Sequence, residues 1–302
     1  MKTIAFILPQ NPYLPELKAY TYYFTRKGFN TVNISDIKDL DTLEYNVEWH
    51  FMGIDTIKPR KGVIKIHDYA SLSTPPFSRV RDFIKKFISK TPHARLFLNE
   101  KVRLGLGFTD NIPFCYRDMG VNKIFFELNK NDTVKKFDFC YLGGMHKVRK
   151  VENFLIYFKE RLKTSTILMI GEAPIYLSEM FKNNPNIIFT GNMEYLKIPA
   201  LLSDCKFGIN YVPNQHPFNI QTSTKLLEYC ACGLKVISNQ YEWVKGFEKK
   251  EKASFFYLKD NFENFTMEEI EKFSYKTPDM KKYDWDIIFE ENKLLELINS
   301  FS

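Results

Sequence analysis

Residues 222–238 read TSTKLLEYCACGLKVIS, and this stretch predicts a short helix followed at once by a buried strand. Ser223 or Thr224 can cap the helix, because both side chains accept a hydrogen bond from a free backbone N–H. Gly233 is placed to end the helix, since glycine adopts the left-handed backbone that often closes one. Residues 235–238 set Val and Ile side by side, which is typical of a buried strand.

The first turn of this helix has the chemistry of an anion site. A helix start attracts anions through its unpaired N–H groups and its dipole. Lys225 adds a full positive charge there, and Glu228 follows three residues later on the same side. A carboxylate would repel a phosphate, but it can accept hydrogen bonds from a ribose diol. The pair therefore indicates a nucleotide, although its spacing fits equally well an amphipathic helix with Lys225 and Glu228 as a surface pair.

Around this stretch, strands and helices alternate through the second half of the chain. The predicted strands are 137–142, 165–170, 187–190, 207–211 and 235–238, and the predicted helices are 150–162, 176–182, 198–204 and 223–232. Alternation at this spacing predicts crossover connections and a parallel sheet. Because ligands bind beyond the carboxyl ends of such strands, we expect the site in the loops that follow them.

The first half shows the same alternation. Its predicted strands are 3–8, 30–34, 48–52, 62–66, 94–98 and 114–116. A length of 302 residues suits two domains of about 150 residues each. We expect an N-terminal Rossmann-like domain over 1–135 and a C-terminal one over 136–284. The last helix, in 285–302, is expected to cross back to the first domain.

The opening stretch resembles the donor-site signature of GT-B glycosyltransferases, above all the large retaining family four. Members read roughly K-x-x-E-x-x-A-x-G-x-x-V-I-S, and the residues that match are Lys225, Glu228, Ala231, Gly233, Val236, Ile237 and Ser238. The resemblance implies that Glu228 binds the nucleotide ribose, and that Ser223, Thr224 and Lys225 receive the phosphates. It departs at Ile220, where the family usually has a glutamate that contacts the donor sugar. The sugar-binding mode and the choice between retention and inversion therefore stay open.

The implied fold class is α/β of the GT-B type, in which two Rossmann-like domains with parallel sheets face each other across a cleft. The resemblance covers residues 137–245, and the first half follows only by its pattern of elements.

The loop after strand 137–142 has a second group of candidate donor-binding residues. Gly143 and Gly144 let the backbone approach a ligand. Lys147 and Arg149 stand at a helix start, where positive charge is unfavourable, so we expect them to clamp a diphosphate. A solvated basic turn is the alternative. The resembled family carries an Arg and a Lys in this region that hold the leaving diphosphate.

Two weaker candidates follow the next two predicted strands. Gly171 follows the strand 165–170, and Asn192 follows the strand 187–190. Both match places where GT-B proteins hold the base and line the donor site, although Gly and Asn are common in any such loop.

No metal ion or other cofactor is expected. Two Asp-x-Asp pairs, at Asp39 and Asp284, match the metal motif of the other glycosyltransferase fold, GT-A, but Asp284 is better explained as a helix N-cap. In the GT-B interpretation the nucleotide sugar is a co-substrate. Its diphosphate is neutralised by Lys147, Arg149, Lys225 and the helix start.

The first half is predicted to bind the acceptor. Residues 1–139 carry 22 Lys and Arg against 15 Asp and Glu, whereas residues 140–302 carry 21 of each. This surplus favours an anionic partner, such as a lipid-linked or phosphorylated saccharide. Nucleic acid is not expected, because no binding motif for it is present.

His67 and Asp68 follow a predicted strand and are candidates for catalysis on the acceptor hydroxyl, with a structural His–Asp turn as the alternative. The loop Gln10–Tyr13 is a further acceptor-side candidate.

Residues 77–90 form an amphipathic pattern with apolar positions at helical spacing and five basic residues around them. Such a helix can lie on an anionic membrane surface. The alternative is that its apolar stripe packs against the sheet of the first domain and leaves the lysines in water.

The sequence thus predicts a metal-independent glycosyltransferase that uses a nucleotide sugar, with UDP the expected nucleotide, in the synthesis of a surface polysaccharide or glycolipid. A GT-B nucleotide-sugar epimerase and a non-catalytic GT-B partner subunit remain as alternatives. Five cysteines without framework spacing favour free thiols, and therefore a protein of the cytoplasm that can act at the inner face of the membrane.

Overall fold

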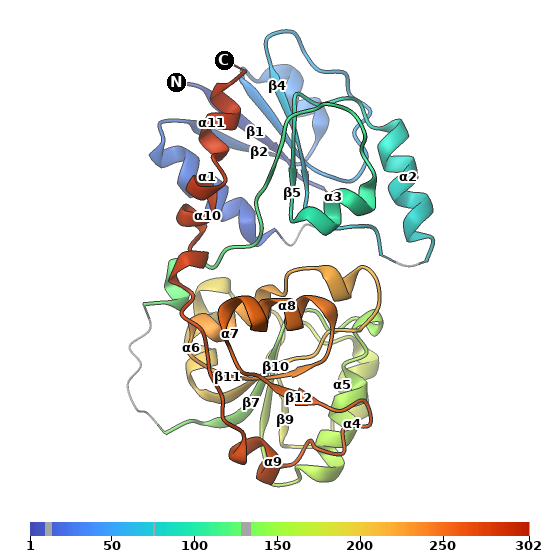
Figure 1. Ribbon diagram of the computed structural model, residues 1–302, viewed down its shortest axis with the longest axis vertical. Helices are drawn as coiled ribbons and strands as arrows, with labels where there is room; N and C mark the ends of the chain where they lie inside the picture. The colour runs from blue at the N-terminus through green and yellow to red at the C-terminus, as the bar shows by residue number, and fades with distance from the viewer. Residues whose placement is uncertain (10–13, 75, 128–133, 302) are drawn as a thin grey trace. The chain divides into compact units, whose positions relative to one another are not determined.

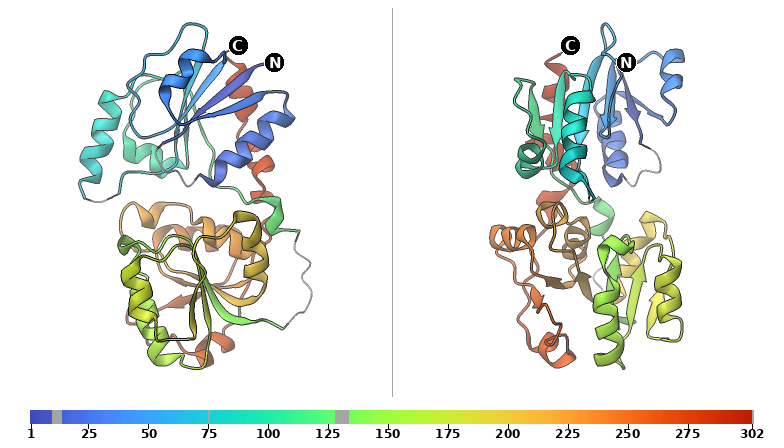
Figure 2. Two further views of the ribbon diagram at one scale, coloured as in Figure 1. Left: turned by 180° about the vertical axis from the view of Figure 1, so that it is seen from behind. Right: turned by 90° about the vertical axis from the view of Figure 1, so that its right-hand side faces the viewer.

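The computed structural model describes residues 1–9, 14–74, 76–127 and 134–301. The chain divides into two compact units. Unit 1 is Met1–Gly120 with Tyr283–Ser302, and unit 2 is Val121–Lys282. Figures 1 and 2 show the course of the chain in each unit. The candidate loop Gln10–Tyr13 lies outside the described residues.

Unit 1 is built on a parallel sheet with the strand order β2-β1-β3-β4-β5-β6. The strands are β1 (Thr3–Ile7), β2 (Asn30–Ile34), β3 (Val47–Phe51), β4 (Ile64–Tyr69), β5 (Ala94–Phe97) and β6 (Phe114–Tyr116). The helices are α1 (Pro15–Arg26), α2 (Ser78–Ile88), α3 (Glu100–Leu106), α10 (Trp285–Glu291) and α11 (Leu294–Asn299).

Aromatic side chains hold α1 between the sheet and the end of the chain. The Tyr20 ring lies 4.7 Å from that of Trp49 on β3 and stacks at 4.7 Å on Phe289 of α10. The last residues therefore belong to unit 1 (Figure 1). The helix expected in 285–302 is broken into α10 and α11, because Lys293 has a left-handed backbone with φ 53°.

Unit 2 has a second parallel sheet with the order β12-β11-β10-β7-β8-β9. The strands are β7 (Phe137–Leu142), β8 (Ile167–Ile170), β9 (Ile187–Phe189), β10 (Cys205–Asn210), β11 (Lys235–Asn239) and β12 (Phe256–Leu258). The helices are α4 (Glu152–Arg161), α5 (Ile175–Phe181), α6 (Ile198–Ser203), α7 (Thr224–Ala231), α8 (Glu242–Glu251) and α9 (Met267–Lys272).

The order of this second sheet marks one place for a ligand. The chain starts at β7, adds β8 and β9 on one side, and then returns to add β10, β11 and β12 on the other. The strand order therefore reverses between β7 and β10. In open α/β sheets the ligand binds at the carboxyl ends of the two strands that flank such a reversal.

Tyr229 fixes the position of α7 beside the ends of β7 and β10. A Cβ on Gly208 of β10 would lie 2.6 Å from the Tyr229 ring, so only glycine leaves room for it. The Tyr229 hydroxyl accepts a hydrogen bond of 2.7 Å from the backbone N–H of Leu142, the last residue of β7. One buried side chain thus ties α7 to both strands.

Three expectations about organisation need correction. The described residues 121–127 lie in unit 2, and Tyr283 and Asp284 lie in unit 1, whereas the sequence analysis placed the domain boundaries at 135 and 284. Strand β4 runs to Tyr69, beyond its predicted end at 66, because polar residues inside a buried strand resemble a loop in sequence.

The division into two units changes the net charge on which the prediction of an anionic acceptor was based. Unit 1 contains 19 Lys and Arg against 17 Asp and Glu, and unit 2 contains 24 against 19. The acidic residues of α10 and α11 almost cancel the surplus of the N-terminal half. The net charge of unit 1 therefore no longer argues for an anionic acceptor.

The apolar stripe of residues 77–90 does not pack against the sheet. Asp82 is the buried residue of α2, and the apolar side chains face solvent, namely Phe77, Val80, Phe83, Ile84, Phe87 and Ile88. The expectation of a buried stripe is wrong. Among the described helices, none is both long and apolar enough to cross a bilayer.

Candidate nucleotide site in unit 2

The candidate site begins at the first residue of α7. Ser223 holds the N-cap position, but its side chain does not cap the described helix as predicted. Its hydroxyl instead donates a hydrogen bond of 2.7 Å to Oδ1 of Asn210, at the end of β10. The Ser223 carbonyl accepts from the N–H groups of Leu226 and Leu227 and so begins the helix.

Asn210 organises the surroundings of this helix start. It is fully buried, and its Nδ2 donates to the hydroxyls of Ser238 at 3.0 Å and Tyr241 at 2.9 Å. A buried network with every polar atom bonded is rigid. Sequence reasoning missed Asn210, although an amide that ends an apolar strand was a usable signal.

Lys225 is buried at the end of β7. Its Nζ donates a hydrogen bond of 3.0 Å to the hydroxyl of Tyr141 and lies 4.1 Å from the centre of the Tyr141 ring. Burial lowers the pKa of Lys225 well below its ordinary value, and the nearby positive charge of Arg149 lowers it further. The opposing effect of Glu228 is smaller. The site is therefore short of negative charge.

Glu228 is the second buried ionisable group of α7. Its Oε1 accepts a hydrogen bond of 3.1 Å from the hydroxyl of Tyr195. Burial raises the pKa of Glu228 from 4.5 to about 8, despite the opposing hydrogen bond from Tyr195 and the charge of Lys225. At neutral pH this carboxyl is therefore mainly protonated.

Two glycine loops border the site. Gly143 has φ 118° and Gly171 has φ 133°, a backbone that side chains rarely adopt. A Cβ on Gly171 would lie 2.7 Å from the carbonyl oxygen of Gly143, so glycine is needed for the two loops to meet. A Cβ on Gly143 would lie 3.9 Å from Cε of Lys225. The predicted glycines 143 and 171 therefore lie together beside the lysine.

The other predicted donor-binding residues differ in their burial and in their contacts. The Arg149 guanidinium lies 4.5 Å from the centre of the Phe218 ring and is close enough to lower the pKa of Lys225. Lys147 and Gly144 are exposed beside it. Asn192 donates a hydrogen bond of 3.1 Å to Oε2 of Glu172, across the loops after β8 and β9. Thr224 is the first residue of α7.

Two buried amide atoms beside the helix start lack partners. Within the residues that the structure describes, Oδ1 of Asn219 and Nε2 of Gln221 make no hydrogen bond. They flank Ile220, the position without the expected glutamate. Buried polar atoms are nearly always satisfied, so these two point to a bound polar group.

Solved structures share the fold of this chain over nearly its whole length. Sucrose-phosphate synthase from Thermosynechococcus elongatus matches 100% of this chain and 100% of its own, with a TM-score of 0.70 and 11% identity. HepE from Anabaena, solved with UDP, matches over 99% and 98%, with a TM-score of 0.65 and 11% identity. UDP-GlcNAc 2-epimerase from Methanocaldococcus jannaschii, solved with UDP-GlcNAc and UDP, matches over 99% and 99%, with a TM-score of 0.58 and 12% identity. No family model matches the chain, and no curated protein matches its sequence.

The chain has the GT-B fold. The fold class predicted from the sequence is confirmed. At this level of identity the likeness establishes the architecture, whereas substrate and reaction have to be argued from the site itself.

The two predicted catalytic residues of this GT-B chain lie inside unit 1, on opposite faces of its sheet. His67 is fully buried and its Nε2 lies 2.9 Å from Oδ2 of Asp55. Burial, which outweighs that carboxylate, lowers the pKa of His67 to about 4. Asp68 faces α1, where it accepts hydrogen bonds of 2.8 Å from Arg117 and 2.9 Å from Tyr20. Neither side chain is exposed, which favours a structural role over the predicted catalytic one.

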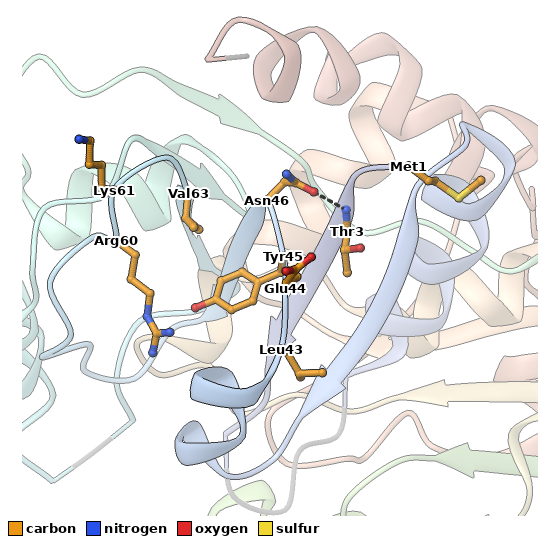
Figure 3. Close-up of a pocket in the computed structure, with 9 residues that line it drawn as sticks. All are labelled: Met1, Thr3, Leu43, Glu44, Tyr45, Asn46, Arg60, Lys61 and Val63. Atoms are coloured by element: carbon orange, nitrogen blue, oxygen red, sulfur yellow. Dashed lines mark hydrogen bonds between the residues drawn. The ribbon is translucent and has the colours of Figure 1, made fainter.

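A surface pocket of unit 1 does not change this assignment. It measures about 470 Å³ and is lined by residues that include Thr3, Tyr45, Asn46 and Arg60 (Figure 3). The Asn46 side chain accepts a hydrogen bond of 2.8 Å from the N–H of Thr3. These residues stand at the amino ends of β1 and β3. In a GT-B unit the ligand is expected at the opposite, carboxyl ends.

Among the described residues, no group of three or more His, Cys, Asp or Glu side chains is arranged to hold a metal ion. Asp284 caps α10, where it accepts a hydrogen bond of 2.9 Å from the N–H of Asp286. That part of the Asp-x-Asp motif is an N-cap, as expected.

Proposed function

We propose that this chain is a glycosyltransferase that takes its sugar from a UDP-linked donor bound in unit 2. The observation that carries the proposal is the pair on α7, where Lys225 and Glu228 are buried with their pKa values moved toward the neutral forms. Buried ionisable groups with perturbed pKa values at the switch point of a sheet are typical of a ligand site.

A nucleotide diphosphate would reverse both shifts. Phosphate oxygens beside Lys225 and Arg149 would supply the negative charge that favours a protonated lysine. Ribose hydroxyls that donate to Glu228 would favour its carboxylate form, because hydrogen bonds to the charged form stabilise it. The helix start and the exposed Lys147 would add to the binding of the phosphates.

The sugar is proposed to lie against residues 219–221. Its hydroxyl groups can donate to the amide oxygen of Asn219 and accept from the amide nitrogen of Gln221, which satisfies both orphan atoms. Ile220 offers no carboxylate there, so the proposal includes neither a stereochemical course nor a residue for general base catalysis.

The finer parts of the proposal follow from the sequence resemblance. We group the chain with glycosyltransferase family four by its donor-site motif, without assigning a stereochemical course, and expect transfer without a metal ion to a saccharide or lipid-linked acceptor, in surface polysaccharide or glycolipid synthesis. The cysteines of the described residues are free thiols, which fits a reducing cytoplasm.

A second candidate function is epimerisation of a nucleotide sugar. The full-length match to the epimerase of M. jannaschii favours it, since the fold is shared. An epimerase would convert UDP-GlcNAc without an acceptor, whereas a transferase needs one. Incubation with UDP-GlcNAc alone, followed by NMR for inversion at C2, separates the two.

The donor site is tested by calorimetric titration of the chain with UDP, GDP, CMP and ADP in the presence of EDTA. We expect UDP to bind, and Glu228→Ala to weaken UDP by about tenfold or more, because hydrogen bonds to a charged group are worth about 1.5–3 kcal/mol. Glu179→Ala, at an exposed position of α5, is the control for general damage.

Each outcome decides the question. Loss of UDP binding only in Glu228→Ala supports the donor site. A requirement for Mg²⁺ would contradict metal independence. If no nucleotide binds, or if Glu228→Ala binds UDP as the original chain does, the site in unit 2 is not a donor site and the partner-subunit alternative is preferred.

A further inference from the structure

Helix α2 is attached to unit 1 by its polar side. Asp82 is 5% exposed, and its carboxylate accepts hydrogen bonds of 2.9 and 3.3 Å from the N–H of Ser73. The Lys86 ammonium group donates to the carbonyl of Gly107 after α3. An ordinary surface helix packs through its apolar stripe. Helix α2 has the opposite orientation, because its polar side faces unit 1 and its apolar stripe faces outward.

The outward side of α2 is a continuous apolar surface. Its members are Val80, Phe83, Ile84, Phe87 and Ile88, all exposed. The rings of Phe83 and Phe87 are 62% and 65% exposed and lie 4.4 Å apart. Leu104 of the neighbouring α3 is exposed as well, and α2 stands at the edge of unit 1 (Figures 1 and 2). An apolar surface of this kind normally marks a binding partner.

Positive charge borders this surface along both edges. At about 100° per residue, Arg81 and Lys85 fall on one side of the apolar arc, and Arg79 and Lys86 fall on the other. The exposed Lys90 follows just after the end of the helix at Ile88. Asp82 is the one acidic residue of the helix sequence, and it is buried underneath. The outer face of α2 is therefore apolar along its middle and cationic along both edges.

We propose that α2 is an interfacial helix that holds this protein on an anionic lipid surface. Such a surface has apolar acyl chains for the phenylalanines and anionic headgroups at the level of the basic flanks. A second copy of the chain fits less well, because face-to-face pairing of α2 would bring the cationic edges together without an exposed acid on either helix. The proposal does not depend on the function of unit 2.

The test is flotation of the full chain with vesicles of phosphatidylcholine alone or of phosphatidylcholine mixed with phosphatidylglycerol. We expect binding to the anionic vesicles only, weakened by added salt. The double variant Phe83→Ser with Phe87→Ser removes two exposed rings and should reduce binding about tenfold or more. Arg79→Glu with Lys90→Glu should reduce it similarly.

The matched control is Ile175→Ser with Met180→Ser, which removes exposed apolar side chains from α5 in unit 2. We expect it to bind vesicles as the original chain does. Because all these positions are exposed, thermal unfolding and UDP binding should be the same in every variant, which keeps this test separate from that of the donor site.

Three results would overturn the proposal. They are equal binding to neutral and anionic vesicles, no binding to either, and binding that the α2 variants leave unchanged. Light scattering adds a fourth: a dimer that Phe83→Ser with Phe87→Ser disperses would show that a second copy covers α2 instead.

Discussion

The two units bury charged groups in opposite ways. In unit 1, Arg117 is fully buried and donates hydrogen bonds of 2.8 Å to both Asp68 and Glu16. Burial alone would lower the pKa of Arg117, but Asp68 and its other anionic neighbours raise it above the ordinary value. In unit 2, Lys225 and Glu228 are buried as well, yet the pKa of the lysine is lowered and that of the glutamate is raised.

This difference in pKa shifts distinguishes charged groups that stabilise the fold from ionisable groups that are placed to bind a ligand. Where a buried ion has complementary partners, as Arg117 has in Asp68 and Glu16, its charged form persists and removal of one partner is costly, although burial still raises the pKa of Glu16. Where burial dominates, as on α7, the protein carries an electrostatic cost that a ligand of the right charge can remove. The position of the perturbed pair, and not the presence of charge, points to function.

The largest effect is expected from Arg117→Met, which breaks the charge network of unit 1. Met has a similar length, but it leaves the carboxylates of Glu16 and Asp68 buried without a cation. We expect a loss of about 3–5 kcal/mol in the free energy of unfolding at neutral pH. Urea denaturation measures it.

The control for Arg117→Met is Arg26→Ala, which removes the surface ion pair with Asp286 and should leave the free energy of unfolding almost unchanged. An equal, small loss for both variants would mean that the buried network does not stabilise unit 1, and the contrast between the units would fail.

The next effect is expected from Lys225→Met in unit 2. It removes a buried amino group whose charged form is poorly stabilised at this position, so thermal stability should stay the same or rise. UDP affinity should fall by about 2 kcal/mol, or about thirtyfold, because a charge-assisted hydrogen bond to phosphate is lost. Calorimetry and thermal unfolding on the same sample give both numbers. A variant that loses stability and keeps its affinity would assign Lys225 to the fold.

The smallest effect is expected from Glu228→Gln, read as a function of pH. The folded pKa of about 8 lies above the ordinary 4.5, so the folded state holds a proton that the unfolded state releases. The stability of the original chain therefore falls as pH rises from about 4.5 to about 8. Gln carries no such cost and keeps an oxygen for the Tyr195 hydroxyl.

We expect Glu228→Gln to be more stable than the original chain at about pH 8, and this difference in stability to shrink toward about pH 5. Thermal unfolding at both pH values measures this. A stability difference between the two chains that does not change with pH would show that Glu228 does not titrate in this range.

Much of the fold could be predicted from the pattern of residues. Strands such as Phe137–Leu142 and Phe114–Tyr116 agree with the prediction to the residue, because apolar runs bounded by glycine or proline specify them locally. Helix α8 and strand β12 were missed, because the sequence around them lacks the strong signals present earlier in unit 2. The extension of β4 to Tyr69 was missed because its polar residues are satisfied only by partners far along the chain, such as Arg117.

For the site, the types of residue were predictable and their partners were not. Lys225 and Glu228 could be selected from one helix turn, whereas Tyr141, Tyr195 and Asn210 lie on other elements that the sheet order brings to α7. The same limit explains His67 and Asp68. Their position near a strand end suggested a reactive pair, but alternation along the strand points them to opposite faces.

By itself the sequence determined two Rossmann-like halves, a helix with a lysine and a glutamate on one side, and a basic amphipathic segment in the first half. These depend on periods of two and 3.6 residues and on glycine stops, which are local properties. Only the tertiary structure decided that Lys225 and Glu228 are buried at a switch point, that Arg117 neutralises Asp68, and that α2 faces outward. Burial and charge pairing depend on contacts between residues far apart in the chain, and no local pattern encodes them.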